Sequence, residues 1–324
     1  MGHLIERLLL SLVGLWLVTI VIFLLLRVAP GDAVVAAAAQ APGEATLTFA
    51  QISSQRAALG LDRPYPVQYA SWIGDLLTLD SGRSVVTGRS VWDELAPRIA
   101  VTAELAVVAS LLTGVLGVSL GLLAATRRGG RVDALVRWGS LLALSVPQFW
   151  LGLITIIFVA SWLGYFFWAT EYAHFWSDPL RNIEQVLIPA IILAMRPIAL
   201  IARVARNGAL DVLSSDYIRA ARARGLPPGL ITFKHVMPAT LIPVITVFGG
   251  QVVYLLGGAV VIESVFNLPG LGRALIDGVA FRDYSLLQFL VTSLAVVAVT
   301  VNLLIDFAYT LLDPRVRYSS ESQS

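Results

Sequence analysis

The sequence predicts an all-α integral membrane protein with six transmembrane helices. Of its 324 residues, 57% are hydrophobic and 14% are charged, whereas a soluble globular domain carries about 25% charged residues. Six stretches are long and apolar enough to cross a bilayer, because a hydrocarbon core about 30 Å thick is crossed by about 20 helical residues. They cover residues 8–26, 100–126, 135–167, 186–202, 238–262 and 287–312.

The first span is expected to stay in the protein as an N-terminal anchor, residues 1–29. Small residues at 36–39 resemble a cleavage site, but the apolar run at 8–26 is longer than the roughly 7 to 15 residues of a signal peptide. Residues 30–99 follow as an outer segment in which aromatic residues such as Tyr69 and Trp72 alternate with turn formers. That mixture predicts a small ordered subdomain on the outer face rather than a linker.

The other five spans make up a core over residues 100–312. The third span is long enough to tilt or to break near Pro147, and the fourth is short and carries Arg196. A long loop over residues 203–237 separates the fourth span from the fifth. Residues 313–324 are expected to be a cytoplasmic tail.

Basic residues predict the orientation of the six spans. The short loops on the side of the N-terminus hold most of the Lys and Arg, including Arg127 and Arg128, whereas the opposite short loops hold Arg181, Arg273 and Arg282. Short cytoplasmic loops are enriched in Lys and Arg. Both termini are therefore expected in the cytoplasm.

Composition also excludes several chemistries. The chain has no cysteine, and its three histidines are too far apart to form a local metal site. Its net charge of +2 gives no indication of nucleic acid as a partner. A Walker A loop needs Gly-Lys followed by Ser or Thr, and the only lysine, Lys234, follows Phe233. We therefore expect no metal, no cofactor bound by this chain and no ATP hydrolysis by it.

One motif invites an enzymatic interpretation. The run from Gly117 through Ser119 to Gly121 matches the nucleophile elbow of hydrolases. It lies inside an apolar helix rather than at a strand-to-helix turn, and no span contains a histidine to act as base. Gly114, Gly117 and Gly121 are better interpreted as a small-residue face for helix packing.

The loop at 203–237 contains a short helix with both ends marked. Ser214 or Ser215 can cap its start, and Gly225 can take the left-handed conformation that ends it. Asp216 suits the positive end of the helix dipole, and Arg222 and Arg224 suit the negative end. About nine residues are too few for a stable isolated helix, so something must hold it. The pair Ala220-Ala221, between Tyr217 and Arg224, predicts a docking surface with a small-residue floor.

These residues resemble a known family. The run Arg219-Ala220-Ala221 with Gly225 and Pro238 is similar to the EAA loop of ABC importer permeases. Motifs along the rest of the chain resemble the B-type permease of the dipeptide, oligopeptide and nickel family. They are Pro30-Gly31-Asp32, Gly60 to Pro64, Leu241-Ile242-Pro243, Glu263 with Phe266, Pro269 to Gly272, Arg282-Asp283-Tyr284, and Asp313-Pro314-Arg315 with Arg317.

The resemblance departs from the family pattern in three places. Arg219 replaces the acidic first residue of the general EAA motif, as peptide-type permeases commonly show. His235 and Met237 stand where the broad motif has Ile and Leu. The run from Thr78 to Gly82 replaces a glycine-aspartate-leucine-glycine sequence, so the family pattern does not predict the shape of the outer subdomain.

The resemblance implies a type I ABC importer permease with the MetI-like fold. It implies that the helix at 216–225 is the coupling helix, which contacts a cytoplasmic ATPase subunit. The partners implied are a second permease, two ATPases that carry ATP and Mg, and an extracytoplasmic substrate-binding protein. The chain would then lie in the cytoplasmic membrane of a bacterium or archaeon and move substrate inward by alternating access.

Polar residues within the spans are candidates for the transport pathway. Arg196 either lines that pathway or makes a structural contact, and Gln251 and Glu104 are similar cases. Counting residues along the helices pairs Arg203 with Asp306 as a structural ion pair. Asn302, Asp306, Tyr309 and Asp313 share one helix face and predict a polar seam.

We expect a peptide as the substrate, with nickel chelate, glutathione, opine or sugar as alternatives within the family. The rival classes are a self-sufficient secondary transporter or channel and an intramembrane hydrolase. The segment 263–272 is open to interpretation as a re-entrant loop, a contact for the binding protein or a plain turn.

Overall fold

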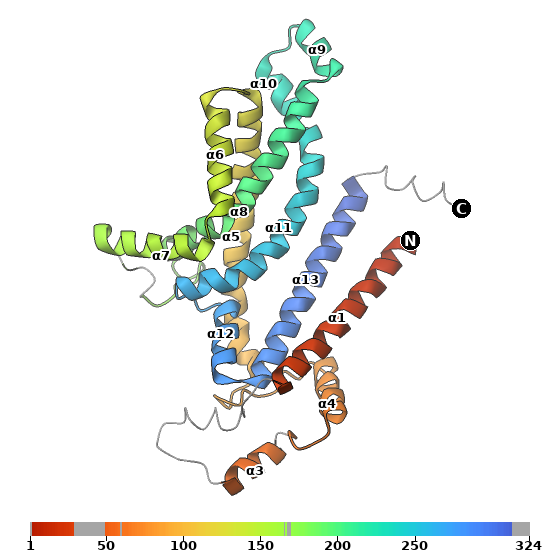
Figure 1. Ribbon diagram of the computed structural model, residues 1–324, viewed down its shortest axis with the longest axis vertical. Helices are drawn as coiled ribbons and strands as arrows, with labels where there is room; N and C mark the ends of the chain where they lie inside the picture. The colour runs from red at the N-terminus through yellow and green to blue at the C-terminus, as the bar shows by residue number, and fades with distance from the viewer. Residues whose placement is uncertain (1, 29–48, 59, 165, 167–169, 313–324) are drawn as a thin grey trace. The chain divides into compact units, whose positions relative to one another are not determined.

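A computed structural model covers the 324 residues and describes 2–28, 49–58, 60–164, 166 and 170–312 (Figure 1). The described part is helical, apart from one isolated bridge between Arg83 and Ser90. The predicted tail at 313–324, and residues 30–48 and 59 of the predicted outer subdomain, lie outside the described residues. The fold class expected from composition, an all-α membrane protein, is confirmed.

The chain divides into two compact units. Unit 1 comprises Met1–Val101 and Pro269–Thr300, and unit 2 comprises Thr102–Leu268 and Val301–Ser324. Two long helices, α5 (Val91–Thr126) and α13 (Tyr284–Leu312), contribute to both units. The division expected between residues 99 and 100 therefore falls inside α5.

Unit 1 contains α1 (Gly2–Val28), α3 (Phe49–Ala58), α4 (Tyr65–Leu77) and α12 (Leu271–Phe281). Aromatic contacts hold α4 against α1, since the Tyr69 hydroxyl lies 2.8 Å from the Thr19 hydroxyl and Trp72 stacks on Phe23. The start of α5 packs on α12 and α13 through a buried apolar cluster. Its members are Val91, Leu95, Leu271, Ala274, Leu286 and Leu290.

The segment before α5 is ordered by a buried carboxylate. Asp283 is 2% exposed, and it accepts hydrogen bonds from the Ser84 hydroxyl and from the backbone N–H of Val85 and Leu286. These bonds join the outer segment to the start of α13. Within its described part, the outer segment is thus a folded element rather than a linker.

Unit 2 contains the second part of α5 and the helices that follow it in the chain up to Val265. They are α6 (Arg131–Ser145), α7 (Gln148–Phe158), η1 (Val159–Leu163), α8 (Pro179–Leu213), α9 (Asp216–Ala223), α10 (Pro228–Ile231), η3 (Thr232–Val236) and α11 (Met237–Val265). Figure 1 shows α9 and α10 together at one end of this unit, beyond the end of α8.

The described part of the chain has five candidate membrane spans, or the predicted six if one bent pair of helices counts as a span. Five helical segments in the described part are long and apolar enough to cross a bilayer: Leu8–Val28, Val91–Thr126, Pro179–Leu213, Pro228–Val265 and Tyr284–Ile305. A sixth consists of the pair Arg131–Ser145 and Gln148–Trp162, bent by 100°. The bend lies at Val146 and Pro147, where a break was predicted, because proline disfavours helical geometry in the residue before it.

The fourth span differs from the prediction. Hydropathy ends it at Ala202, but α8 continues to Leu213, so residues 203–213 do not belong to a loop. Charged residues stop a hydropathy run without stopping a helix, because Ala, Arg and Leu all favour helical conformation. Ala205 and Ala209 are fully buried, which holds this extension against the rest of unit 2.

Glycines allow α5 and α8 to pack closely. A Cβ atom added at Gly121 would lie 2.6 Å from the Ala202 carbonyl oxygen, and one at Gly117 would lie 2.7 Å from Ile201. Both distances are too short for non-bonded carbon. The predicted packing face is therefore confirmed for these two residues, whereas a Cβ at Gly114 would make an ordinary contact of 3.5 Å with Phe248.

Candidate functional site

The end of unit 2 that carries α9 is the candidate site. Helix α9 starts after Ser215, whose backbone is extended, and it is followed by Gly225 in the left-handed conformation with φ +78°. The expected serine cap is wrong, because the Ser215 hydroxyl donates to the Val212 carbonyl at 2.7 Å and does not bond α9. The expected glycine stop is confirmed.

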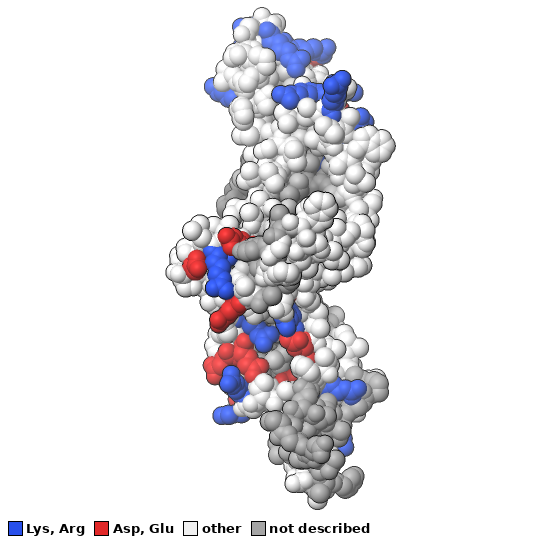
Figure 2. All heavy atoms as spheres, turned by 90° about the vertical axis from the view of Figure 1, so that its left-hand side faces the viewer, with Lys and Arg blue, Asp and Glu red and all other residues white. Residues whose placement is uncertain are grey.

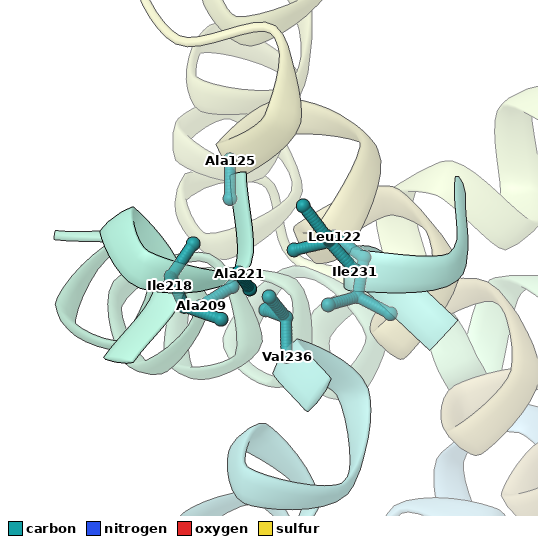
Figure 3. Packing of buried hydrophobic residues seen from close by; sticks show 7 residues of the cluster. All are labelled: Leu122, Ala125, Ala209, Ile218, Ala221, Ile231 and Val236. Atoms are coloured by element: carbon teal, nitrogen blue, oxygen red, sulfur yellow. The ribbon is translucent and has the colours of Figure 1, made fainter. Parts of the chain in front are cut away.

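One face of α9 is part of the core of unit 2. Ile218 and Ala221 are 0% and 1% exposed, and their spacing of three residues places them on the same side of the helix. They pack into a cluster with residues from four other helices, as Figure 3 shows. The other members are Leu122 and Ala125 of α5, Ala209 of α8, Ile231 of α10 and Val236 of η3.

This packing corrects the prediction for Ala221. The pair Ala220-Ala221 was expected to form the floor of a docking surface, but Ala221 faces the interior and only Ala220 is exposed. Adjacent residues on a helix point about 100° apart, so the pair cannot share a face. Ala221 holds α9 in place, and the cluster supplies the support that so short a helix requires.

The opposite face of α9 is exposed and mostly polar. Besides Ala220, the exposed residues of the predicted set are Asp216, Tyr217, Arg219, Arg222, Arg224 and Gly225. Asp216 and Arg219 form an ion pair one turn apart. The Tyr217 hydroxyl lies 2.6 Å from His235 Nδ1, with the two rings edge to face. That contact braces α9 against η3.

A hollow adjoins the exposed face. It encloses about 450 Å³ between the ends of α5 and α8 and the α9–α10 segment, and its lining includes Leu213, Leu226, Arg222 and Arg128. Figure 2 shows Lys and Arg gathered at this end of unit 2, next to a largely uncharged surface. An apolar lining with a basic rim suits a protein partner that presents apolar and acidic side chains.

A buried ion pair beneath this end was missed by sequence reasoning. Asp133 of α6 is 1% exposed, and it receives Nε and Nη2 of Arg206 at 2.6 and 3.0 Å. It also accepts the backbone N–H of Gly129 at 3.0 Å. The bidentate pair fixes α6 against α8. The sequence does contain a signal for this ion pair: Asp133 is a single acidic residue among several arginines, and it follows a glycine turn.

The pathway candidates lie in different surroundings. The Arg196 guanidinium lies 5.4 Å from the ring centre of Tyr254, over its face, and the residue is exposed within unit 2. Gln251 is half-buried in α11. Gln148 donates to the Leu193 carbonyl at 2.9 Å. This bond ties the start of α7 to α8 directly after the bend between α6 and α7.

Glu104 anchors an outer loop. It accepts the Tyr172 hydroxyl at 2.6 Å, and Asn182 donates to the same hydroxyl at 3.2 Å. Burial, followed by the hydrogen bond to Glu104, raises the pKa of Tyr172 above its ordinary value. Gln185 extends the network to the Ala173 amide and the Thr170 hydroxyl. These contacts join the loop at 170–174 to Glu104 of α5 and to the start of α8.

The carboxylate of Glu263 is a second buried acidic group, and no pattern in the sequence indicated its burial. Glu263 is 0% exposed near the end of α11 and accepts the Thr102 hydroxyl at 2.7 Å. The chain then turns at Asn267, with φ +56°, and enters α12 after Gly270. The segment at 263–272 is therefore a helix end, a turn and the start of a second helix.

The predicted partner of Arg203 cannot be placed. Asp306 belongs to α13, but its side chain lies outside the described residues, as do those of Tyr309 and Asp313. Arg203 is exposed on α8 and has no ion pair within the part of the chain that the structure describes. The ion pair stays a prediction.

Comparison with known proteins agrees with this architecture. Residues 117–318 match the model of the family described as binding-protein-dependent transport system inner membrane component, and residues 1–106 match the model of its N-terminal part. A permease of the methionine ABC transporter MetNI, in inward-facing form, has a similar fold with a TM-score of 0.53 at 19% identity. That match covers 68% of this chain and 96% of the other.

Curated relatives match over nearly their whole length. The chain is 39% identical to the probable peptide ABC transporter permease protein y4tP of Sinorhizobium fredii, over 98% of this chain and 99% of the relative. It is 36% identical to the di/tripeptide transport system permease protein DppB of Pseudomonas aeruginosa, over 93% and 94%. It is 33% identical to the oligopeptide transport system permease protein AppB of Bacillus subtilis, over 98% and 99%.

The fold and these matches define a class: a multi-pass membrane permease with the MetI-like fold. The chain belongs to the family of inner membrane components of binding-protein-dependent transport systems, and it is the permease subunit of such a system. The relatives are transport subunits rather than enzymes.

Proposed function

We propose that this permease carries peptides inward across the cytoplasmic membrane, driven by ATP hydrolysis on partner subunits that contact α9. The exposed face of α9 is the observation that carries the proposal. A buried cluster holds one face of this short helix in place, and its other face is exposed. The relatives' names, which specify peptides, dipeptides and oligopeptides, support the choice of substrate.

The partners follow from what the chain lacks and what its family description says. Its sequence has no Walker A loop, so ATP and Mg would be held by two ATPase subunits. The family is binding-protein-dependent, which calls for an extracytoplasmic substrate-binding protein. A second permease of similar fold would complete the pathway, with Arg196 and Gln251 as candidate lining residues.

The charge distribution supports a cytoplasmic position for α9. Basic residues gather at this end of unit 2, and cytoplasmic ends of membrane proteins are enriched in Lys and Arg. In this orientation both termini are cytoplasmic. The ATPases then meet the hollow beside α9, and rocking between inward-open and outward-open states would pass through this contact.

A pair of charge reversals tests the coupling contact. Arg222 of α9 and Arg131 of α6 are both exposed at the same end of unit 2, but only Arg222 lines the hollow beside α9. In the reconstituted complex, Arg222→Glu is expected to lower ATP-driven uptake at least about tenfold, because placing like charges together costs several kcal/mol and about 1.4 kcal/mol is a factor of ten.

The control separates coupling from general charge. Arg131→Glu should transport like the wild type, and both variants should reach the membrane in equal amounts. Equal uptake by the two variants would contradict the proposed contact. Co-purification of the ATPases, measured in parallel, reports whether Arg222→Glu weakens assembly or only the stimulation of ATP hydrolysis.

The substrate is tested by competition. Uptake of a labelled dipeptide by vesicles that contain the complete complex and its binding protein should be suppressed by unlabelled di- and tripeptides. The alternative substrates, namely a nickel chelate, glutathione, an opine and a sugar, should not compete. Uptake of one of these without dipeptide uptake would keep the permease assignment and overturn the peptide.

A further inference from the structure

A groove between α6 and α8 is not used by the proposed coupling or transport. It encloses about 250 Å³ within unit 2. Two arginines, Arg137 and Arg203, line it together with the polar side chains of Ser140 and Asn207. Leu141 supplies an apolar wall. The groove thus combines cationic and apolar surface in one small space.

Among the described residues, the groove brings three arginines near a single carboxylate, that of Asp133. Arg206 also lines it, but this arginine is occupied by the bidentate bonds to Asp133. Asp133 is 2% exposed at its side chain and lies 3.8 Å from Arg137, which is itself 56% exposed. Arg203 has no ion pair among the described residues. An anion entering the groove would therefore meet two available guanidinium groups.

The groove lies where the apolar part of the membrane ends. Arg203 is the first charged residue after the apolar run Ile198–Ala202, about 15 Å before α8 ends at Leu213. Trp138, next to Arg137 on α6, is 66% exposed, and Leu135 and Leu142 are exposed beside it. Exposed tryptophan is typical of the membrane–water interface, so this level corresponds to lipid headgroups.

We propose that this groove binds an anionic phospholipid, with Arg137 and Arg203 contacting the phosphate oxygens and an acyl chain lying against Leu141. Guanidinium groups bind phosphate through paired, charge-assisted hydrogen bonds. Basic pockets between transmembrane helices are suited to anionic headgroups. The exposed side chain of Leu141 in the groove favours a lipid over a soluble anion, because it offers an acyl chain an apolar surface to cover.

The site is independent of the proposed transport function. Under the orientation proposed above, the bound lipid belongs to the cytoplasmic leaflet, where it would stabilise the junction of α6 and α8 close to the Asp133–Arg206 pair. Loss of peptide transport would not remove the lipid site, and loss of the lipid site leaves the family assignment untouched.

The test is lipid retention by the complete complex, purified in detergent with its partner subunits and studied by native mass spectrometry. Phosphatidylglycerol and phosphatidylcholine with identical acyl chains are added separately. Phosphatidylglycerol should be retained preferentially. Arg137→Gln and Arg203→Gln should each lower its affinity about fivefold, the effect of one basic residue at a membrane surface.

Matched variants show whether charge in the groove is responsible. Arg131→Gln removes an exposed arginine from the same helix outside the groove and should retain the lipid like the wild type. Arg203→Lys keeps the charge and should restore most of the affinity, which separates the site from a folding defect. Retention that is equal in wild type, Arg137→Gln and Arg203→Gln would overturn the proposal.

Two other results would also overturn it. Displacement of phosphatidylglycerol by inorganic phosphate would assign the groove to a soluble oxyanion. Retention by the isolated permease but not by the complex would show that a partner subunit covers the groove.

Discussion

At the residue scale, the pair Asp133–Arg206 is the most buried ion pair among the described residues of unit 2. Both side chains are well buried, at 2% and 16% exposed, and the carboxylate also receives the Gly129 amide. A buried ion pair contributes little net stability relative to apolar residues, but breaking it leaves one charge without a partner. The pair therefore acts mainly by specifying how α6 lies on α8.

This predicts a non-additive response to substitution. Asp133→Ala should destabilise the permease by about 3 kcal/mol, since Arg206 would stay buried and unpaired. The double variant Asp133→Leu with Arg206→Met should recover most of that loss. Thermal unfolding of the purified complex measures both variants. A double variant that loses the sum of the two single effects would show that the residues act separately.

Gly225 and Ala221 show how differently two small residues of one segment are constrained. Gly225 has open space around its Cα and is required for its left-handed backbone, which costs other residues about 1–2 kcal/mol. Ala221 has ordinary helical geometry and is required because it is buried. A charge at Ala221 would disrupt the support of α9, so only exposed positions such as Arg222 can test coupling itself.

At the element scale, the crossing of α5 and α8 depends on glycine. Gly121→Ala should destabilise unit 2 by about 1–3 kcal/mol, the usual effect of overpacking, because its Cβ would meet backbone atoms of α8 that cannot move alone. Gly114→Ala is the matched control on the same helix and should be tolerated. Yield and thermal stability in detergent measure the pair. Because Ala favours helical conformation over Gly at both positions, equal stability of the two variants would show that close packing at Gly121 does not limit the crossing.

The outer loop at 170–174 is an element held by hydrogen bonds. Tyr172→Phe removes the donor to Glu104 and should lower stability by about 1 kcal/mol at neutral pH, the usual net contribution of a hydrogen bond, since Tyr172 is only half-buried. The raised pKa of Tyr172 sets the pH dependence. A raised pKa contributes stability below the ordinary value of about 10, and the contribution falls as pH rises above it.

Thermal unfolding at neutral and alkaline pH therefore distinguishes the two proteins. The advantage of the wild type over Tyr172→Phe should be present near neutrality and should shrink above the ordinary tyrosine pKa. An advantage that grows with pH would contradict the assignment of Tyr172 as a neutral donor.

At the scale of the whole molecule, the permease should be inactive by itself. Its sequence has no Walker A loop, so ATP would have to be used by partner subunits. Vesicles that contain only this chain and its partner permease should not accumulate dipeptide on a proton or sodium gradient. Addition of the ATPases, ATP and the binding protein should start uptake. Gradient-driven uptake without ATPases would indicate a secondary transporter instead.

Local features of the sequence predicted much of the architecture. The break at Pro147, the start of α9 at Asp216 and the turn at Gly225 depend on residues that are contiguous in the chain, and all three are confirmed, although α9 ends at Ala223 rather than at Gly225. The end of α8 was misplaced because charge was taken as the end of the helix. The Ser215 cap was wrong because its hydroxyl bonds backward to Val212.

The sequence by itself determined that this chain is a helical membrane protein with long apolar spans and a marked short helix, because hydropathy and helix ends are properties of neighbouring residues; its motifs determined the resemblance to permeases. Only the tertiary structure decided which face of α9 is free. Ala221 is buried by Leu122 and Val236, about a hundred residues apart, and no local pattern specifies that meeting. The same holds for the bond between Asp133 and Arg206 and for the groove beside it, since packing alone brings α6 and α8 together.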